Sequence, residues 1–179
     1  MLKFYNRGFI GWQAGLLLSV LSIAIIASVI FGVRSFENSA SVQNIPTDIK
    51  QIVSHVIYYP DSTSGLSVDK NSFKFDDASE VLSFTAKYGN ANITIAEQAT
   101  PENFVDIPPA YDKLIETLNS YYAFSSFHGT VHLTKPKENK GQQSAVMNSK
   151  GTLMFANVTG GSLTENEWKK FFNNLEVIR

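Results

Sequence analysis

The clearest pattern in the chain is an uninterrupted apolar run near its beginning. Residues 14–33 read AGLLLSVLSIAIIASVIFGV and contain neither a charged residue nor a proline. At about 1.5 Å rise per residue, a helix of this length spans about 30 Å, the thickness of the hydrocarbon core of a bilayer. Core helices of water-soluble proteins rarely run this far without a charge. The pattern therefore predicts a transmembrane helix at residues 14–33.

The charges beside this run predict its orientation. Lys3, Arg7 and the N-terminal amine precede it, whereas Arg34 after it is soon followed by Glu37. Because positive charge is retained on the cytoplasmic side, we expect residues 1–13 in the cytoplasm and the remainder of the chain outside. An uncleaved anchor fits better than a cleaved signal peptide, whose apolar region is normally about 7–15 residues long.

The pattern changes after the apolar run. Residues 34–45 are polar, rich in small side chains and aperiodic, which is typical of a short tether. Residues 46–179 then show helical and strand periodicities in turn, and their number suits one folded domain. We therefore expect an extracytoplasmic domain at residues 46–179.

Strand patterns dominate this expected domain. Apolar and polar positions alternate at residues 72–76, 82–88, 92–95 and 131–133, and residues 145–147 and 152–158 are expected to form two more strands. Residues 56–59 are also expected to be extended, because Pro60 disfavours a helix before it. Gly89-Asn90 is a two-residue hairpin signal, and period-2 alternation is typical of antiparallel sheets with one packed face. The pattern predicts a mostly antiparallel sheet of six or seven strands.

Helical periodicity occurs in three places. One helix is expected from Thr47 to about Ser54, and another opens at Pro108-Pro109. The motif Thr164-x-x-Glu167 is a capping box, which predicts the start of the last helix. The apolar stripes of the last two helices are Tyr111, Leu114, Ile115 and Leu118, and Trp168, Phe171, Phe172 and Leu175. The expected fold class is α+β, with the helices packed on one face of the sheet.

Composition excludes several classes of protein. The chain has no cysteine, which excludes disulfide frameworks, cysteine-ligated zinc folds, thiol nucleophiles and lipid-anchored lipoproteins. The net charge of the whole chain is −1, but residues 35–179 carry 12 Lys and Arg against 16 Asp and Glu, a net charge of −4. An acidic outer part disfavours nucleic acid and anionic lipid as partners.

The three histidines do not predict a metal site. His128 and His132 are four residues apart, a spacing that suits a metal on a helix but covers about 13 Å along a strand. His55 lies far from both in the sequence. We therefore assign no metal ligand and no cofactor.

One short motif is found in serine hydrolases. Ser67-Val68-Asp69-Lys70 matches S-x-x-K, but the S-D-N and K-T-G companions are absent and the residues lie in a turn-rich stretch. A hydrolase would need a pocket that groups Ser67 and Lys70 with a carboxylate or histidine. Asp76-Asp77 is interpreted as a turn, and Gly160-Gly161 as a flexible turn before the last helix rather than an anion site. No catalytic residue is assigned.

Three segments resemble a family: IPTDIKQIVSHVIYYP, NITIAEQATPENF and GTLMFANVTGGSLTENEWKKFFNNLEVI. They are similar to uncharacterised extracytoplasmic domains of single-pass bacterial membrane proteins, which are loosely similar to anti-sigma-factor C-terminal and lipoprotein-carrier-like domains. The shared motifs are an extended Tyr-Tyr-Pro, an Ile-x-Ile-x-Glu-Gln strand and a closing hairpin plus helix. None is catalytic, so the resemblance implies no functional residue.

The leading functional hypothesis is a membrane-anchored binding or assembly domain without catalytic activity. It would use the concave face of its sheet for an apolar ligand or a partner protein. The alternative is a type IV pilin-like subunit processed after Gly8, because Arg7-Gly8-Phe9 before an apolar helix resembles a prepilin leader. Gln13 stands where that family usually has glutamate.

Overall fold

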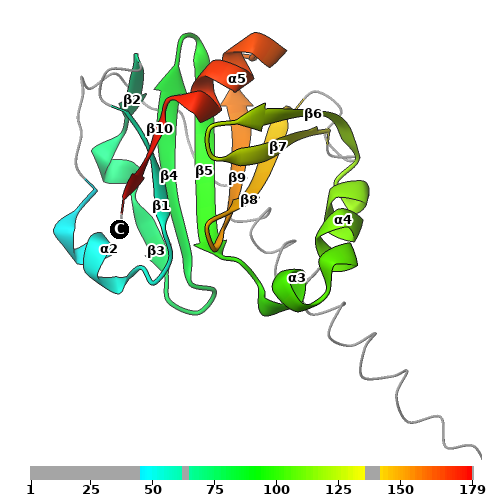
Figure 1. Cartoon of the computed structure of the whole chain (residues 1–179). Coiled ribbons are helices and arrows are strands. Elements are labelled where there is room, and N and C mark those ends of the chain that lie inside the picture. Colours follow the sequence, from blue (N-terminus) through cyan, green and yellow to red (C-terminus); the bar gives the residue numbers. More distant parts are fainter. Residues whose placement is uncertain (1–44, 62–64, 136–141, 179) are drawn as a thin grey trace, which may run out of the picture. The chain divides into compact units, whose positions relative to one another are not determined.

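The computed structural model describes residues 45–61, 65–135 and 142–178 (Figure 1). All of them belong to the second of two compact units in the chain, Asn38–Arg179. The expected transmembrane helix at residues 14–33, the N-terminus before it and the tether at 34–45 lie outside the described residues, apart from Ile45. Within the described ranges, no helix has both the length and the apolar character needed to cross a membrane.

Two antiparallel sheets form the described domain. Neighbouring strands of the larger sheet follow the order β2-β4-β5-β9-β8-β7-β6, and β3 also pairs with β4. Its eight strands are β2 (Leu66–Val68), β3 (Lys74–Asp76), β4 (Val81–Tyr88), β5 (Ala91–Ala99), β6 (Ser120–Ser126), β7 (Gly129–Thr134), β8 (Ser144–Ser149) and β9 (Thr152–Gly160). The smaller sheet, called the ribbon below, pairs β1 (Ile57–Pro60) with β10 (Leu175–Ile178).

Local turns build the larger sheet from two runs of hairpins. The strands β3, β4 and β5 form one run, and β6 to β9 form the other; the two runs meet where β5 pairs with β9. The expected turn at Gly89-Asn90 connects β4 and β5, and Gly89 has a φ of 58°. Positive φ is the geometry of two-residue hairpin turns, so this prediction is confirmed.

The main core lies on one face of the larger sheet. Directly paired residues share a face, and a row across the sheet runs through Phe84, Ile95, Ala156, Ala145 and Leu133, all of them buried. The helix α5 (Glu165–Asn173) and the ribbon lie in front of this face in Figure 1. The α5 residues that join the core are Trp168, Phe171 and Phe172, each 0% exposed. The amphipathic stripe of α5 therefore closes the core.

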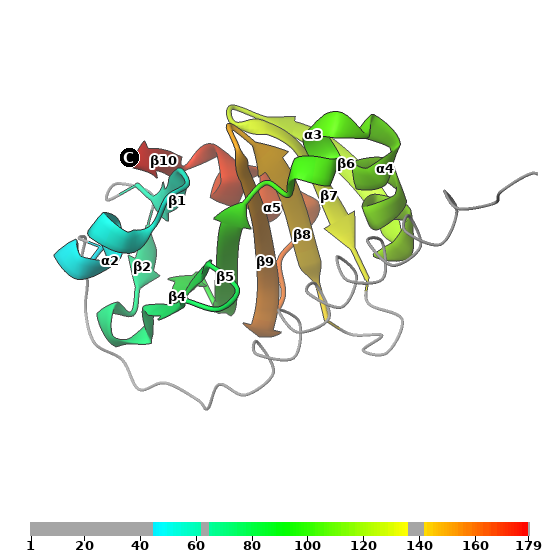
Figure 2. The ribbon, with the colours of Figure 1, turned by 90° about the horizontal axis from the view of Figure 1, so that it is seen from below.

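The opposite face of the sheet also has helices. The connection from β5 to β6 contains α3 (Glu102–Asp106) and α4 (Pro108–Thr117), which Figure 2 shows from below. His132 points to the face opposite Val131 and Leu133, and its ring meets the ring of Tyr111 at 6.1 Å. The expectation that all helices pack on one face is therefore wrong. The physical reason is that β8 and β9 bury apolar side chains on both faces: Ala145, Val146, Met147, Leu153, Met154 and Phe155.

The number of strands is also larger than expected. The six or seven predicted strands become eight in the main sheet and two in the ribbon. The sequence patterns missed β2, β6 and β10, because two of these strands are short and the third, β6, alternates weakly. The capping box is confirmed: Thr164 Oγ1 accepts from the Glu167 N–H, and the Glu167 carboxylate accepts from the Thr164 N–H. The first helix is α2 (Thr47–Ile52), shorter than predicted.

Candidate functional site

The most unusual side chain of the domain is a glutamate inside the main core. Ile93, Ile95 and Glu97 occupy successive inward positions of β5, so the strand directs a carboxyl group to the same face as two isoleucines. Glu97 pairs across the sheet with Leu82 and Met154 and is 0% exposed. A carboxyl group in such a place needs a hydrogen-bond donor to offset the loss of water.

The donor comes from the ribbon. The Tyr58 backbone N–H donates to Glu97, with distances of 3.1 Å to Oε1 and 3.3 Å to Oε2. Tyr58 belongs to β1, which pairs with β10 alone, and alternate N–H groups of such a strand point away from its partner. The Tyr58 N–H is one of these groups, and it is buried. Glu97 therefore provides the acceptor that a neighbouring strand would otherwise provide.

Further polar groups hold the same end of the sheet together. The Tyr58 hydroxyl donates to the Ser149 carbonyl at 3.2 Å, and the Ser149 hydroxyl donates to the His128 carbonyl. The His128 ring meets the Tyr58 ring edge-on at 5.2 Å, and its Nε2 lies 2.7 Å from the Leu175 carbonyl oxygen. Because a carbonyl only accepts, Nε2 carries a proton. These contacts join β1, β8, β10 and the turn between β6 and β7.

Burial shifts the pKa of Glu97. Removal from water raises the pKa of Glu97 well above its usual value, and the bond from the Tyr58 N–H lowers it by less. The same cause raises the pKa of Tyr58, against a smaller opposite effect of its bond with Ser149. Burial therefore favours the uncharged form of Glu97, whose carboxyl group binds the Tyr58 N–H and has no contact with solvent.

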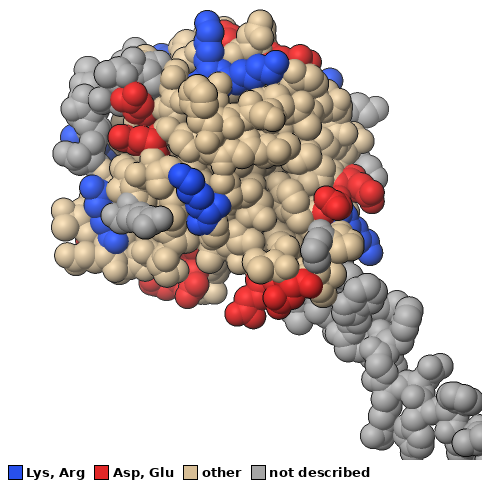
Figure 3. Space-filling model, viewed as in Figure 1, with Lys and Arg blue, Asp and Glu red and all other residues tan. Residues whose placement is uncertain are grey.

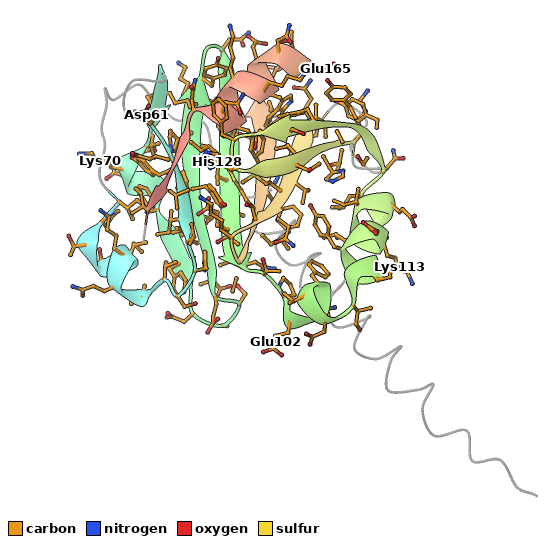
Figure 4. All side chains as sticks on the ribbon, in the orientation of Figure 1. Asp61, Lys70, Glu102, Lys113, His128 and Glu165 are labelled. Carbon is orange, nitrogen blue, oxygen red and sulfur yellow. The ribbon has the colours of Figure 1, made fainter. Side chains whose placement is uncertain are left out.

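The sequence motif Ser67-x-x-Lys70 is not part of this cluster. Ser67 lies in β2, paired with Lys87, and Lys70 begins a short 3-10 turn, η1 (Lys70–Ser72), on the surface. Figure 4 shows Lys70 and His128 in separate places, with His128 beside the ribbon. Among the described residues, no hydrogen bond joins Ser67 or Lys70 to a histidine or to Glu97.

The other candidate positions have local roles. The Asp76 carboxylate accepts from the Ala78 N–H at 3.0 Å and from the Ser79 hydroxyl at 2.8 Å, so the predicted turn at Asp76-Asp77 is confirmed. His128 and His132 lie on opposite sides of the sheet, the first beside Tyr58 and the second beside Tyr111. No group of three or more His, Asp or Glu residues that could hold a metal occurs among the described residues.

Glu97 is not among the residues that the sequence patterns single out, although the alternation of β5 indicates that its side chain points inward. In a strand whose inward positions are Ile93 and Ile95, the next inward position is 97, and an acid there requires a buried donor. The identity of that donor was not visible, since Tyr58 is 39 residues away. The resemblance had singled out both motifs, Tyr-Tyr-Pro and Ile-x-Ile-x-Glu-Gln, without connecting them.

The geometry defines the class of the fold: an α+β domain with an eight-stranded antiparallel sheet, helices on both faces and a covering ribbon. Comparison with family models, with curated proteins and with solved structures finds no match.

Proposed function

We propose that the chain is a membrane-anchored binding or assembly protein without catalytic activity, held by residues 14–33 with residues 46–179 on the outer side. The anchor rests on the apolar run and its flanking charges. The observation that carries the non-catalytic role is the use of the interior polar groups. Glu97 binds the Tyr58 N–H, and Thr152 donates to the Val56 carbonyl at 2.6 Å. These groups hold backbone segments together, a structural task.

The structure favours a partner protein over an apolar ligand. The core face of the sheet, where a ligand was expected, is filled by side chains of α5 and of the ribbon, including Trp168 and Tyr58, both 0% exposed. A ligand on this face would have to displace α5. The outer surface is directly available to another protein, and Figure 3 shows a broad area without charged side chains over β6 and β7.

Cysteine labelling in intact cells tests the topology. The chain has no natural cysteine, so Asn6→Cys and Ala78→Cys each introduce a single thiol, the second in an exposed turn. A membrane-impermeant maleimide should label Ala78→Cys in intact cells and Asn6→Cys only after lysis. Equal labelling of both variants in intact cells, or recovery of the chain in the soluble fraction, would overturn the proposal.

Genetic complementation tests the non-catalytic role. In cells whose own copy is deleted, Ser67→Ala and Lys70→Ala chains should restore the wild-type phenotype, because neither side chain is expected to carry chemistry. A chain without residues 14–33 should not restore it. Failure of both single variants, with normal amounts of folded protein, would instead favour a hydrolase.

The pilin-like alternative rests on Arg7-Gly8-Phe9 before the apolar run. Mass spectrometry of the purified chain distinguishes the two proposals. A mature N-terminus at Phe9 would support the pilin-like subunit, and an intact Met1 would exclude this alternative.

A further inference from the structure

A short stretch of chain leads into the ribbon: residues 45–55, called the entry segment below. It consists of Ile45, Pro46, the helix α2 and the bend before β1, and Figure 1 shows α2 at the margin of the domain. The helix has six residues and no side-chain cap at its start. Isolated helices of this length are not stable in water, so α2 depends on its contacts with the rest of the domain.

Those contacts are few. The buried side chains of the entry segment are Ile45 and Ile49, which are 2% and 8% exposed and belong to the main core. Most of its other residues are exposed, including Ile52 at 50%. Segments with little buried apolar surface are the ones that open locally while the remainder of a domain stays folded.

The hydrogen bonds of the entry segment are internal. The Lys50 N–H donates to the Pro46 carbonyl and the Val53 N–H to the Ile49 carbonyl, both at 3.1 Å. Among the described residues, no hydrogen bond joins the entry segment to another element. The bond from Thr152 holds residue 56, immediately after the segment. Detachment of residues 45–55 would therefore break no hydrogen bond to the sheet or to the ribbon.

The last side chain of the entry segment is held in an unfavourable place for an imidazole. Both ring nitrogens of His55 are buried, and neither has a hydrogen-bond partner. A neutral imidazole has one N–H donor, whereas the protonated ring has two donors and a positive charge. The site therefore holds the neutral ring at some cost and provides no acceptor for the charged ring.

No charged group compensates for a proton on His55. The charged residues on the entry segment and on the elements around it are exposed: Asp48, Lys50, Lys74, Asp76, Lys150 and Glu176. The buried titratable groups beside them, Tyr58 and Glu97, are bonded to each other. Burial lowers the pKa of His55 to about 4, and no charged side chain among the described residues opposes this shift.

We propose that His55 is an acid-sensitive switch, in which the uptake of one proton by its ring detaches the entry segment while the sheet and the ribbon stay folded. The proton comes from water and binds the ring nitrogen that is unprotonated in the closed form. The charged ring then moves into solvent, and α2 loses its packing on the core. Detachment adds residues 45–55 to the tether, which gains up to about 36 Å in reach.

This inference goes beyond the proposed anchoring. The added reach has a meaning only if residues 14–33 lie in a membrane, but detachment depends on the described domain alone. Hydrogen exchange measures detachment and thiol labelling measures topology, so either proposal can fail while the other stands.

The size of the effect follows from the pKa of His55, which is about 4 in the closed segment and 6.5 in an open one. The closed segment is fully stable above the higher value and loses stability as pH falls. Its open population should rise about thirtyfold between pH 7.5 and pH 5. Hydrogen exchange of the full chain in detergent micelles, corrected for the intrinsic pH dependence of exchange, should show this rise at Lys50 and Val53.

Urea distinguishes local detachment from unfolding of the whole domain. Exchange at Lys50 and Val53 should not respond to low urea concentrations, because detachment exposes little surface. Exchange at Ile95, in the centre of the larger sheet, should be much slower and should increase with urea. Equal rates at the three positions, with the same response to urea, would show that the entry segment opens only with the whole domain and would overturn the proposal.

His55→Leu is the matched control. Leucine has a similar volume and takes up no proton, so exchange at Lys50 and Val53 should not rise between pH 7.5 and pH 5 in this variant. His55→Gln, which is also neutral, repeats the test with a polar side chain, and circular dichroism checks that both variants are folded. Exchange in the wild-type chain that does not change with pH, or the same thirtyfold rise in either folded variant, would contradict a switch at His55.

Discussion

Two glutamates of this domain make the same kind of bond in opposite surroundings. Glu97 accepts from the Tyr58 N–H inside the core, and Glu167 accepts from the Thr164 N–H at 2.7 Å on the surface, at the start of α5. Burial raises the pKa of Glu97 well above its usual value, whereas the bond from the Thr164 N–H lowers the pKa of Glu167. The two pKa values shift in opposite directions because Glu97 is removed from water and Glu167 is not; both groups accept a backbone hydrogen bond.

This contrast explains what each carboxyl group can contribute. An exposed carboxylate keeps its charge and adds a favourable interaction with the helix N-terminus. Burial favours the uncharged form of an enclosed carboxyl group, which accepts from a strand N–H that would otherwise be unpaired. The first adds stability to a helix, and the second makes the packing of β1 on the sheet possible.

The largest expected effect comes from deleting the buried acceptor. Glu97→Ala leaves the Tyr58 N–H unpaired and creates a cavity, so we expect the free energy of unfolding to fall by about 3 kcal/mol. Glu97→Gln keeps an acceptor of similar size and should cost less than about 1 kcal/mol. Urea denaturation at pH 6.5 measures both. Similar losses in the two variants would show that the bond to Tyr58 is unimportant.

The pH dependence of stability should reveal the neutral acid. Because the pKa of Glu97 is higher in the folded than in the unfolded chain, its contribution is fully present below the unfolded pKa and is lost as pH rises toward the folded pKa. In that window the free energy of unfolding should fall by up to about 1.4 kcal/mol per pH unit. The Glu97→Gln chain should lack this fall.

One histidine titrates in the same pH range, so the fall should be measured as the difference in stability between the wild-type and Glu97→Gln chains. Burial lowers the pKa of His55 to about 4, so this group destabilises the fold as pH decreases from about 6.5. A wild-type chain whose stability rises, relative to Glu97→Gln, as pH increases above the unfolded pKa of glutamate would contradict a raised pKa of Glu97.

A smaller effect is expected at the surface cap. Thr164→Ala removes the acceptor for the Glu167 N–H at the start of α5 and should cost about 1 kcal/mol. Thr164→Ser keeps the hydroxyl and serves as the control. Thermal unfolding followed by circular dichroism measures both. A serine variant as unstable as the alanine variant would show that the hydroxyl at position 164 does not stabilise α5.

The smallest effect is expected for Glu167→Gln. Since the pKa of Glu167 is lowered in the folded chain, its ionised form stabilises above the unfolded pKa, and this contribution disappears as pH falls. The variant should therefore be slightly less stable than wild type at pH 7 and equal to it at pH 3. A difference that grows toward pH 3 would contradict a lowered pKa of Glu167.

Features encoded by neighbouring residues were predictable from the sequence. Gly89-Asn90 lies between two alternating segments, and Thr164 and Glu167 are three residues apart, so both the hairpin and the capping box follow from local chemistry. The same local logic identified most strands of the sheet.

Features that depend on distant pairing were not predictable. Leu175 continues the apolar stripe of the last helix, but it lies in β10 because Pro60 of β1 pairs with it. The helices after β5 lie on the second face because β8 and β9 are apolar on both faces, and a single chain does not show which helix covers which face. Tyr58 and Glu97 meet for the same non-local reason.

The ribbon also sets the order in which the chain can fold during synthesis. Ile57, near the start of the domain, pairs with Ile178 of β10, so β1 has no strand partner until β10 leaves the ribosome. Until then the Tyr58 N–H and the core face of the sheet stay open to water and to chaperones. The emergence of residue 178 is therefore the event that lets the nascent domain close.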